Sequence, residues 1–464
     1  MTRTNGCAGD HAVVLGGGMA GLFAARVLAD HYTEVTVVER DRLASTGTAR
    51  RGVPQGRHSH GLLMRAAEIA EKRFPGLIDE LIMDGAKAFS AFDNFRAVFF
   101  GNVLHRSATG RSSVAASRPF LESHVRKRVS ALANVAIWDD AAVAGLVAAD
   151  NGVGGVRVLR RETGDEARTV HADLVVDAMG RGTRTGTWLE SLGYPRPRED
   201  QVPVDIAYAT CHFRLPLDAV GGDRVVLVGP MPSRPRGFGF AAQEGDEWVL
   251  SAFGVGKEHH PPSEPDALRE FAAAFAPADV AGVLHDATPV DDVATYRYKT
   301  AVWRRYELLD RVPAGILSIG DAMCCFNPIY GSGMTVAAIS ADVLDAVLRQ
   351  GAEDLPRRYY RRMGRMLRTP WWLTKLSDVT LPSVPLGSGG VKAVLHAGMN
   401  QVFRAASGDP VAASTFLDVL NMNKTPFHMM RPRVAVAIGL ARVRGRRPPD
   451  PGVLPERRCL ARRR

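Results

Sequence analysis

The stretch His11-Ala-Val-Val-Leu-Gly16-Gly-Gly18-Met-Ala-Gly21 decides the fold of this 464-residue chain. An apolar run leads into a glycine-rich turn, and apolar residues at helical spacing follow as far as about residue 31. A second apolar run, Val35–Val38, ends in Glu39, 18 residues after the last glycine of the turn. This order of strand, glycine turn, helix, strand and acid predicts a βαβ unit that binds a dinucleotide.

The glycines of the turn have different physical roles in this prediction. Gly16 permits the tight turn, and Gly18 lets the backbone approach a pyrophosphate because no Cβ stands in the way. Gly21 lets the helix pack closely on the sheet. The first helical turn, which holds Met19 and Ala20, is predicted to turn its free N–H groups toward the phosphates.

The acid at the end of the second strand completes the predicted site. Glu39 can accept hydrogen bonds from a ribose 2′-OH, which argues against a 2′-phosphate here, and the neighbouring Arg40 is included in the site. The alternative, a glycine-rich turn in an unrelated α/β protein, leaves Glu39 unexplained. The motif does not separate NAD from FAD. A second glycine-rich segment, Gly387–Gly390, has no buried strand before it and no matching acid, so we predict a loop there.

The charge of the chain is concentrated at its end. The net charge is +10, but residues 431–464 hold eleven arginines against Asp450 and Glu456, which leaves about +1 for all the rest. A basic body that binds nucleic acid is therefore not predicted. We expect a mobile, solvated tail at 431–464, and weak contact of this tail with an anionic membrane surface is the alternative.

Composition narrows the class of protein further. Hydrophobic residues make up 46% and charged residues 23% of the chain, as in ordinary globular proteins. No apolar run reaches the roughly 18 to 20 residues that span a bilayer, and the polar N-terminus shows no secretory signal. The five cysteines contain no C-x-x-C pair, so neither a zinc site nor a disulfide framework is predicted. These features favour a cytoplasmic protein.

A second informative segment lies far along the chain. Gly315–Ile319 reads as a buried strand that runs into Gly320-Asp321, and a Pro-containing loop follows, Asn327-Pro328-Ile-Tyr-Gly-Ser-Gly333-Met334. Asp321 is placed to bond a sugar-chain hydroxyl. The helix that starts at Gly333 and Met334 can face a negatively polarised ring edge.

The two segments together resemble the FAD-dependent monooxygenases of the aromatic-hydroxylase fold. Three further stretches, Arg51–Leu62, Ser117–Glu122 and Asp177–Arg184, resemble the bacterial branch that includes the polyene epoxidases of polyether biosynthesis, with squalene epoxidase as a more distant relative. One departure is that Met179-Gly180 stands where aromatic hydroxylases have Asp-Gly. This is closer to the Ala-Thr-Gly type of epoxidases, halogenases and prenyl reductases.

The resemblance implies which residues hold the cofactor FAD. The ADP half is implied to lie on the glycine turn and Glu39, the flavin against Arg118, and the pyrophosphate near Arg50 or Arg51. The second flavin motif is implied to comprise Asp321, Pro328, Gly333 and Met334. No catalytic acid or base and no metal is expected.

The resemblance also implies the architecture. We expect an α/β protein in which a Rossmann-like FAD-binding domain carries an inserted mixed β-sheet substrate domain and a C-terminal helical region. The boundaries are 10–62, 112–192 and 308–348 for the FAD-binding domain, 63–111 and 193–307 for the substrate domain, 349–430 for the helical region and 431–464 for the basic tail.

The implied reaction is monooxygenation. A C4a-hydroperoxyflavin is expected to transfer one oxygen atom to an apolar small molecule, by C=C epoxidation or by hydroxylation. The electrons are expected from NAD(P)H or from a separate flavin reductase. The alternatives are a flavin halogenase, although none of the tryptophans lies in a Trp-x-Trp-x-Ile-Pro signature, a prenyl-chain reductase and a non-catalytic FAD-binding protein.

Three residue pairs suggest other chemistry at first sight. His58 and His60 have no carboxylate or cysteine at a helpful spacing, so we expect a polar loop near the cofactor rather than a metal site. Adjacent Cys324 and Cys325 are expected to pack as small side chains, because a disulfide between neighbours is strained. Trp371-Trp372 is expected to pack a helix on the core, with the lining of a substrate cavity as the alternative.

Overall fold

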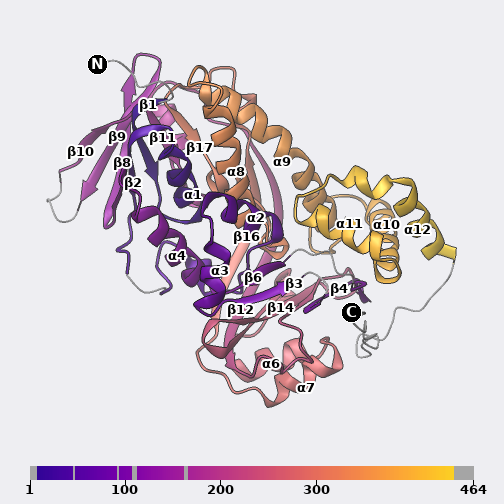
Figure 1. The fold of residues 1–464 in the computed structure, drawn as a ribbon. Helices are drawn as coiled ribbons and strands as arrows, with labels where there is room; N and C mark the ends of the chain where they lie inside the picture. The colour runs from indigo at the N-terminus through magenta and orange to yellow at the C-terminus, as the bar shows by residue number, and fades with distance from the viewer. Residues whose placement is uncertain (1–7, 45–47, 91–92, 107–111, 161–165, 444–464) are drawn as a thin grey trace, which may run out of the picture.

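The computed structural model describes residues 8–44, 48–90, 93–106, 112–160 and 166–443 (Figure 1). A five-stranded parallel sheet has the order β17-β11-β1-β2-β7. Its strands are short and rich in buried Val, Leu and Ile, as expected for a parallel sheet that is covered on both faces. They are β1 (Gly9–Leu15), β2 (Tyr32–Val38), β7 (Val135–Trp138), β11 (Leu174–Asp177) and β17 (Ile316–Ser318).

Helices pack on this sheet and fix the positions of the two predicted cofactor segments. Helix α1 follows the glycine turn, and it packs against α8, which in turn contacts α2 and α9. The apolar residues of α8 are buried along nearly its whole length. The helices of this layer are α1 (Met19–Leu28), α2 (Met64–Arg73), α3 (Leu77–Met83), α4 (Arg118–Ser130), α5 (Thr185–Ser191), α8 (Gly333–Leu348) and α9 (Leu355–Val379).

A mixed sheet forms the second body, with the order β18-β16-β12-β15-β14-β13-β4-β5. Helices α6 (Pro265–Ala273) and α7 (Ala278–Asp286) bury Leu268 and Leu284 in one core cluster with Phe238 and Trp248 of the sheet. The strands are β4 (Phe95–Phe99), β5 (Asn102–Val103), β12 (Glu199–Arg214), β13 (Val225–Val228), β14 (Arg236–Gln243), β15 (Glu247–Val255), β16 (Ala294–Arg304) and β18 (Cys324–Cys325).

Two smaller sheets and several short 3-10 turns complete the α/β part. The small sheets consist of β8 (Ala141–Ala149), β9 (Gly152–Arg160) and β10 (Arg168–His171), and of β3 (Lys87–Ser90) with β6 (Ser112–Ala115). The turns are η1 (Pro54–Arg57), η3 (Gly180–Gly182), η4 (Glu244–Asp246), η5 (Lys257–His259), η6 (Tyr306–Leu308), η7 (Gly320–Ala322), η8 (Pro328–Tyr330) and η9 (Pro426–Met430). The predicted α/β class with a parallel sheet and a separate mixed sheet is confirmed.

The segment 63–111, predicted as part of the substrate domain, divides between the two bodies. Helix α2 contacts α8 and shares the core of the parallel-sheet layer, whereas β4 pairs with β13 in the mixed sheet. The physical reason is that α2 buries its apolar side chains, among them Ile69, against α8, which the sequence places 270 residues away.

The C-terminal helices form a lobe at one side of the molecule (Figure 1). They are α10 (Gly389–Gly408), α11 (Pro410–Leu420) and α12 (Pro432–Val443). The segment predicted as a mobile tail therefore begins with a helix: α12 packs against α10 and α11, and Val434 is only 2% exposed. The apolar run Val434 to Leu440, which the sequence alone left as a possible membrane-surface contact, instead places Val434 and Ile438 in one apolar cluster with Ala405 of α10 and Ala412 of α11. The remainder, 444–464, lies outside the described residues.

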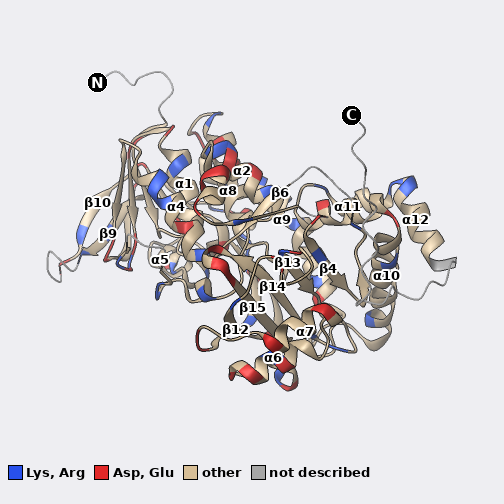
Figure 2. Cartoon of the chain, turned by 60° about the horizontal axis from the view of Figure 1, so that its bottom comes forward, with Lys and Arg blue, Asp and Glu red and all other residues tan. Residues whose placement is uncertain are grey.

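The described helices include none that combines the length and the apolar character needed to cross a membrane. Acidic and basic residues are both spread over the chain outside its end, and acidic ones gather on α6 and α7 (Figure 2). This distribution agrees with the near-neutral charge of residues 1–430.

Candidate cofactor-binding site

In the turn between β1 and α1, the surrounding chain leaves no room for a side chain at two of the three predicted glycines, Gly16 and Gly21. Gly16 has φ +104°, and a Cβ there would lie 2.7 Å from the carbonyl oxygen of Ala178. A Cβ on Gly21 would lie 1.8 Å from the carbonyl oxygen of Gly16. On Gly18 the nearest atom would be Arg50 Nη2 at 3.7 Å, an ordinary contact. Only at Gly18 does the chain leave room that a ligand can use.

A cavity of about 440 Å³ adjoins this turn and contains three of the predicted site residues, Arg40, Arg50 and Arg118. It is lined by charged and small side chains from the segment after β2 and from the start of α4. The full lining is Arg40, Asp41, Arg42, Leu43, Ala44, Thr48, Ala49, Arg50, Arg51, Val53, Gly56, Arg118, Pro119, Glu122, Arg126 and Asp140. Its basic side chains suit a pyrophosphate.

Arg50 occupies the centre of the charged cluster. Its guanidinium lies 3.0 Å from Glu39 Oε2, 3.2 Å from Asp41 Oδ2 and 2.9 Å from Glu122 Oε1. Although burial lowers the pKa of Arg50, the charges of Glu122 and Glu39 raise it more, so the net direction is upward. The side chain of Arg50 is 12% exposed and Arg51 is exposed. The geometry therefore favours Arg50 over Arg51 beside the turn.

Glu39 holds the glycine turn and also pairs with Arg50, which lines the cavity. Its carboxylate accepts hydrogen bonds from the backbone N–H of Gly17 (2.8 Å) and of Asp41 (3.0 Å), and the residue is 4% exposed. Arg40 next to it points outward, with a side chain 68% exposed. The predicted contact of Glu39 with a ribose hydroxyl stays a prediction.

Sequence reasoning missed two acidic members of this cluster. Glu122 contacts Arg50 and also lies 3.2 Å from Arg118 Nη2, and Asp41 accepts a hydrogen bond from the Gly52 backbone N–H (2.6 Å). A signal for Glu122 was present, because residues four apart on a helix share a face and Arg118 starts α4. Asp41 had no comparable signal, because its partners lie on a loop.

The second motif meets the first at the start of α1. Gly320 has φ +56°, and a Cβ there would lie 2.9 Å from the Ala20 side chain. The neighbouring Asp321 is near Gly333, whose ideal Cβ would be 3.9 Å from Asp321 Oδ1. Burial raises the pKa of Asp321, and the charge of Arg118 is the largest influence that lowers it. The fold thus brings the two motifs and Arg118 together.

Both helices that begin at these motifs have N-termini without a side-chain cap. Gly18 occupies the N-cap position of α1, and Ser332 occupies that of α8. Gly18 has no side chain to accept a hydrogen bond from the helix, and the Ser332 side chain accepts none. The Ser332 and Thr335 hydroxyls are buried, and within the described residues they have no hydrogen-bond partner. Pro328 and Gly333 are exposed at this end of α8, whereas Met334 is buried, as is Met19 in α1. Free N–H groups and unpaired hydroxyls suit an anionic or polar ligand.

The middle motif is held by a buried carboxylate. Asp177 accepts hydrogen bonds from the Met179 backbone N–H (3.0 Å), from Thr183 Oγ1 (2.5 Å) and from Ser318 Oγ (3.1 Å). Burial raises the pKa of Asp177. Asp177 thereby joins the Met179-Gly180 turn to β17. Arg181, which follows Gly180, places its guanidinium carbon 4.4 Å from the centre of the Tyr298 ring.

The loop that follows η1 is fixed on the mixed sheet. His58 Nδ1 lies 2.7 Å from Thr210 Oγ1, and Thr210 bonds Ser251 Oγ (2.7 Å), which accepts from the Ser59 backbone N–H (2.7 Å). Burial lowers the pKa of His58 to about 4 and that of His60 to about 3. Both imidazoles are therefore neutral near pH 7.

Aromatic rings from two neighbouring strands surround His58. Tyr208 of β12 pairs in register with Tyr296 of β16, and the His58 ring lies 5.9 Å and 5.7 Å from these two rings. Phe253 of β15 continues the row, 5.7 Å from Tyr208. We call Tyr208, Phe253, Tyr296 and His58 the aromatic wall. Two residues after Tyr296 on the same strand, the Tyr298 hydroxyl donates to the Cys325 carbonyl oxygen (2.9 Å), so the wall lies near the segment of the second motif.

Both cysteines of the adjacent pair and Trp371 pack in the core, whereas Trp371 and Trp372 also line a second cavity of about 370 Å³ together with Arg368 and Lys375. Cys324 and Cys325 are buried, and burial raises the pKa of Cys325 to about 12 and that of Cys324 well above its ordinary value, so both thiols stay protonated. Trp371 is 3% exposed, with its ring 5.8 Å from that of Trp303. Trp372 differs, because it is 52% exposed.

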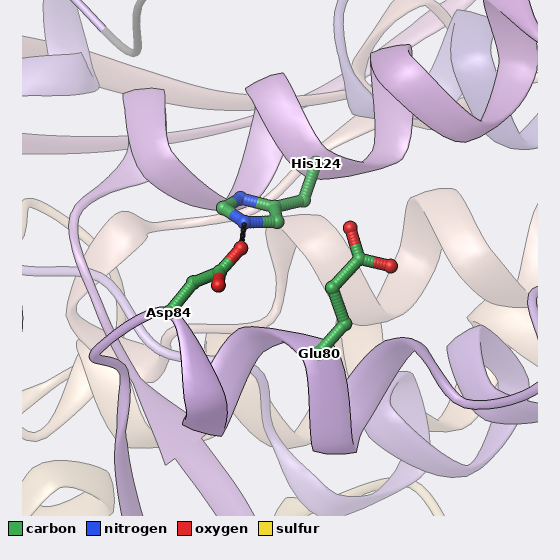
Figure 3. Close-up of side chains that lie close together, drawn as sticks. All are labelled: Glu80, Asp84 and His124. Carbon is green, nitrogen blue, oxygen red and sulfur yellow. Dashed lines mark hydrogen bonds and ion pairs between the residues drawn. The ribbon is translucent and has the colours of Figure 1, made fainter.

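A histidine and carboxylate cluster lies outside this site, between α3 and α4 (Figure 3). His124 points at Asp84 and bonds it at 2.9 Å, while Glu80 lies to one side. Glu80 is already paired with Arg128 at 2.5 Å, and Lys127 lies 3.9 Å from it. Because cations of the chain compete for this carboxylate, we interpret the cluster as an ion-pair clamp between the two helices.

Comparison with known proteins identifies the class of protein that this fold and site define. Residues 11–362 match the family model described as "FAD binding domain", so the chain belongs to this family of flavoproteins, and FAD is its cofactor. Protein Rv3254 of Mycobacterium tuberculosis (strain ATCC 25618 / H37Rv) is a relative, 34% identical over 446 residues that cover 90% of each chain.

Solved structures share the fold of most of the chain. The flavin-dependent brominase Bmp2 superposes with a TM-score of 0.65 at 11% identity, covering 94% of this chain and 98% of its own. The p-nitrophenol 4-monooxygenase PnpA from Pseudomonas putida DLL-E4 gives 0.65 at 14% identity, covering 89% and 99%. At these identities the likeness shows a shared fold and no more, and the resemblance to polyene epoxidases stays a prediction.

The residues present fit FAD. The room at Gly18, the basic side chains of Arg50 and Arg118, and the uncapped N-terminus of α1 suit the pyrophosphate. The uncapped α8, with its unpaired Ser332 hydroxyl, suits the polar edge of the flavin ring. Most of the predicted cofactor residues lie at the start of α1 or of α8 or line the adjoining cavity, and their contacts with FAD stay predictions.

Proposed function

We propose that this flavoprotein is a monooxygenase that transfers one oxygen atom of O₂ to an apolar natural product, by C=C epoxidation or by hydroxylation. The observation that carries the proposal is the aromatic wall, which lies near the segment of the second flavin motif. When bound, FAD supplies the activation of O₂. The residues of this chain then bind and orient the substrate and keep water away from it.

The character of the aromatic wall supports an uncharged substrate. Tyr208 is buried, burial raises its pKa well above the ordinary value, and His58 is neutral near pH 7. Aromatic faces favour contact with an apolar chain or ring, and they offer no charge to pair with an ionic group. No acid or base of the chain is required for transfer to an electron-rich double bond, and we assign none.

The source of electrons belongs to the same proposal. The sequence contains one dinucleotide fingerprint, so the enzyme is proposed to use NAD(P)H without a separate nicotinamide fold or to receive reduced flavin from a partner reductase. The composition supports a cytoplasmic location. Weak contact of 431–464 with an anionic membrane surface stays a prediction.

An oxygen-isotope experiment tests the proposed reaction. Protein loaded with FAD is supplied with NADPH or a flavin reductase, candidate polyenes and aromatic compounds, and ¹⁸O₂ gas. We expect a product whose mass rises by one ¹⁸O atom, and none when O₂ is excluded. Mass spectrometry of the product decides the result.

Three outcomes would contradict monooxygenation, each for a different reason. Product that forms only with bromide or chloride would indicate a halogenase, the activity named for the brominase with the same fold. Saturation of a double bond without O₂ would indicate a prenyl-chain reductase. FAD binding with no effect of any apolar compound on turnover would indicate a non-catalytic flavoprotein.

A further inference from the structure

We propose that Asp378 is a positioning residue for the flavin, because its carboxylate holds the loop that sets the start of α8. Asp378 lies next to the last residue of α9 and is 1% exposed. It lies outside both cofactor motifs. The inference rests on FAD binding at the site described above and extends it to the C-terminal helical region.

Two hydrogen bonds join Asp378 to the second flavin motif. Its Oδ1 accepts from Asn327 Nδ2 at 2.8 Å and from the Tyr330 hydroxyl at 2.8 Å. The two donor residues lie on either side of Pro328, an exposed residue of the motif. Asn327 is itself 1% exposed, and its Oδ1 accepts from the Ile329 backbone N–H at 3.1 Å. The Asp378 carboxylate is therefore hydrogen-bonded to the residue before η8, Asn327, and to its last residue, Tyr330.

The position of η8 determines where α8 begins. Gly331 follows with φ +63°, and the buried Ser332 then caps the helix without a side-chain hydrogen bond. Only these two residues separate Tyr330 from Gly333, the first residue of α8. If Tyr330 moves, the start of α8 must move with it, and so must the free N–H groups that are expected to face the flavin.

Asp378 is also the group in this cluster that changes charge near neutral pH. Burial raises its pKa to about 7, although the hydrogen bonds from Tyr330 and Asn327 lower it. The other titratable groups are Tyr330 of η8 and Tyr208 of β12, whose pKa values burial raises well above the ordinary value, and His58, whose pKa is lowered to about 4. All three remain neutral between pH 6 and 8.

The direction of the pH effect follows from hydrogen bonding. An ionised carboxylate accepts from two donors more strongly than a protonated one. The loop is therefore held most firmly above the pKa of Asp378, and we expect FAD to bind most tightly there. As the pH falls from 8 to 6, the dissociation constant of FAD should rise by about three- to tenfold, with a midpoint near 7.

The experiment is a titration of the apoprotein with FAD, followed by flavin fluorescence and absorption, at pH values from 6 to 8.5. Asp378→Asn is expected to bind FAD with an affinity that does not change across this range. Tyr330→Phe leaves the carboxylate in place but removes one donor to its ionised form. Its midpoint should therefore move to a higher pH.

Asp409→Asn is the matched control. Asp409 caps α11 by accepting from the backbone N–H groups of Val411 and Ala412, and asparagine caps as well. This variant should keep the wild-type pH profile. A wild-type affinity that does not change with pH, or an Asp378→Asn profile that matches wild type, would overturn the inference, and Tyr330→Phe decides the matter if Asp378→Asn does not fold.

Failure of this inference differs from failure of the proposed function. If FAD binds with the expected pH profile but no oxygen reaches any product, Asp378 keeps its positioning role and monooxygenation is wrong. If oxygen transfer occurs and the affinity of Asp378→Asn follows pH like wild type, the positioning role is wrong and monooxygenation stands.

Discussion

Replacing Gly18 with serine should weaken FAD binding by about 30- to 100-fold, or roughly 2 to 2.7 kcal/mol, while leaving the apoprotein as stable as wild type. Gly18 has φ −79° and ψ −179°, an extended backbone that any residue adopts, and its ideal Cβ meets no atom of the chain closer than 3.7 Å. Serine is also a favoured helix N-cap. The added atoms therefore harm only a ligand that approaches this backbone.

Two measurements decide this first prediction. Equilibrium titration with FAD gives the loss of affinity, and urea unfolding of the apoprotein should agree with wild type within about 0.5 kcal/mol. If Gly18→Ser binds FAD as tightly as wild type, the pyrophosphate does not lie against this turn. A large loss of stability would instead show that the chain itself requires glycine there.

Replacing Gly21 with alanine should have the opposite pattern and destabilise the apoprotein itself. The new Cβ would lie 1.8 Å from the Gly16 carbonyl oxygen and 3.0 Å from its carbonyl carbon, and both are backbone atoms that cannot move away without separating α1 from β1. We expect the free energy of unfolding to fall by about 3 kcal/mol, because overpacking exceeds the gain of roughly 1 kcal/mol in helix propensity.

Gly398→Ala in α10 is the control for Gly21→Ala. A Cβ at Gly398 meets nothing within 4 Å, so the same substitution should stabilise the protein by about 0.5 to 1 kcal/mol. Urea unfolding of the two apoproteins measures both effects. Equal stabilities for the two variants would show that the close approach of Gly21 to Gly16 does not exist.

The part of the fold that the sequence could predict is the part written in local patterns. The glycine turn, Glu39 and the Gly320-Asp321 segment each combine a short apolar run with residues that only a particular turn requires. These patterns were enough to predict the α/β class, whereas the convergence of both motifs was implied by the family resemblance, and the close approach of Gly320 to Ala20 agrees with it.

The rest depended on contacts between residues far apart in the chain. Nothing local separates Arg50 from Arg51; the buried carboxylates of Glu39 and Glu122 do, because they attract one guanidinium into the cluster. Asp378 reads as one acid in a basic helix, and only the fold brings it to Asn327, 51 residues earlier. Likewise, the many arginines near α12 favoured a solvated tail, and only the packing of α12 against α10 and α11 shows that Val434 is buried.

The most direct test of the central claim, that the two helix N-termini hold FAD, is amide hydrogen exchange measured by mass spectrometry with and without FAD. Binding is predicted to protect peptides that cover 16–22 and 327–337, because each contains the first turn of an uncapped helix, whose leading N–H groups have no acceptor within that helix. Peptides from the small sheet of β8 and β9 (141–160) should be unchanged. Protection that leaves either helix start unaffected would contradict the account.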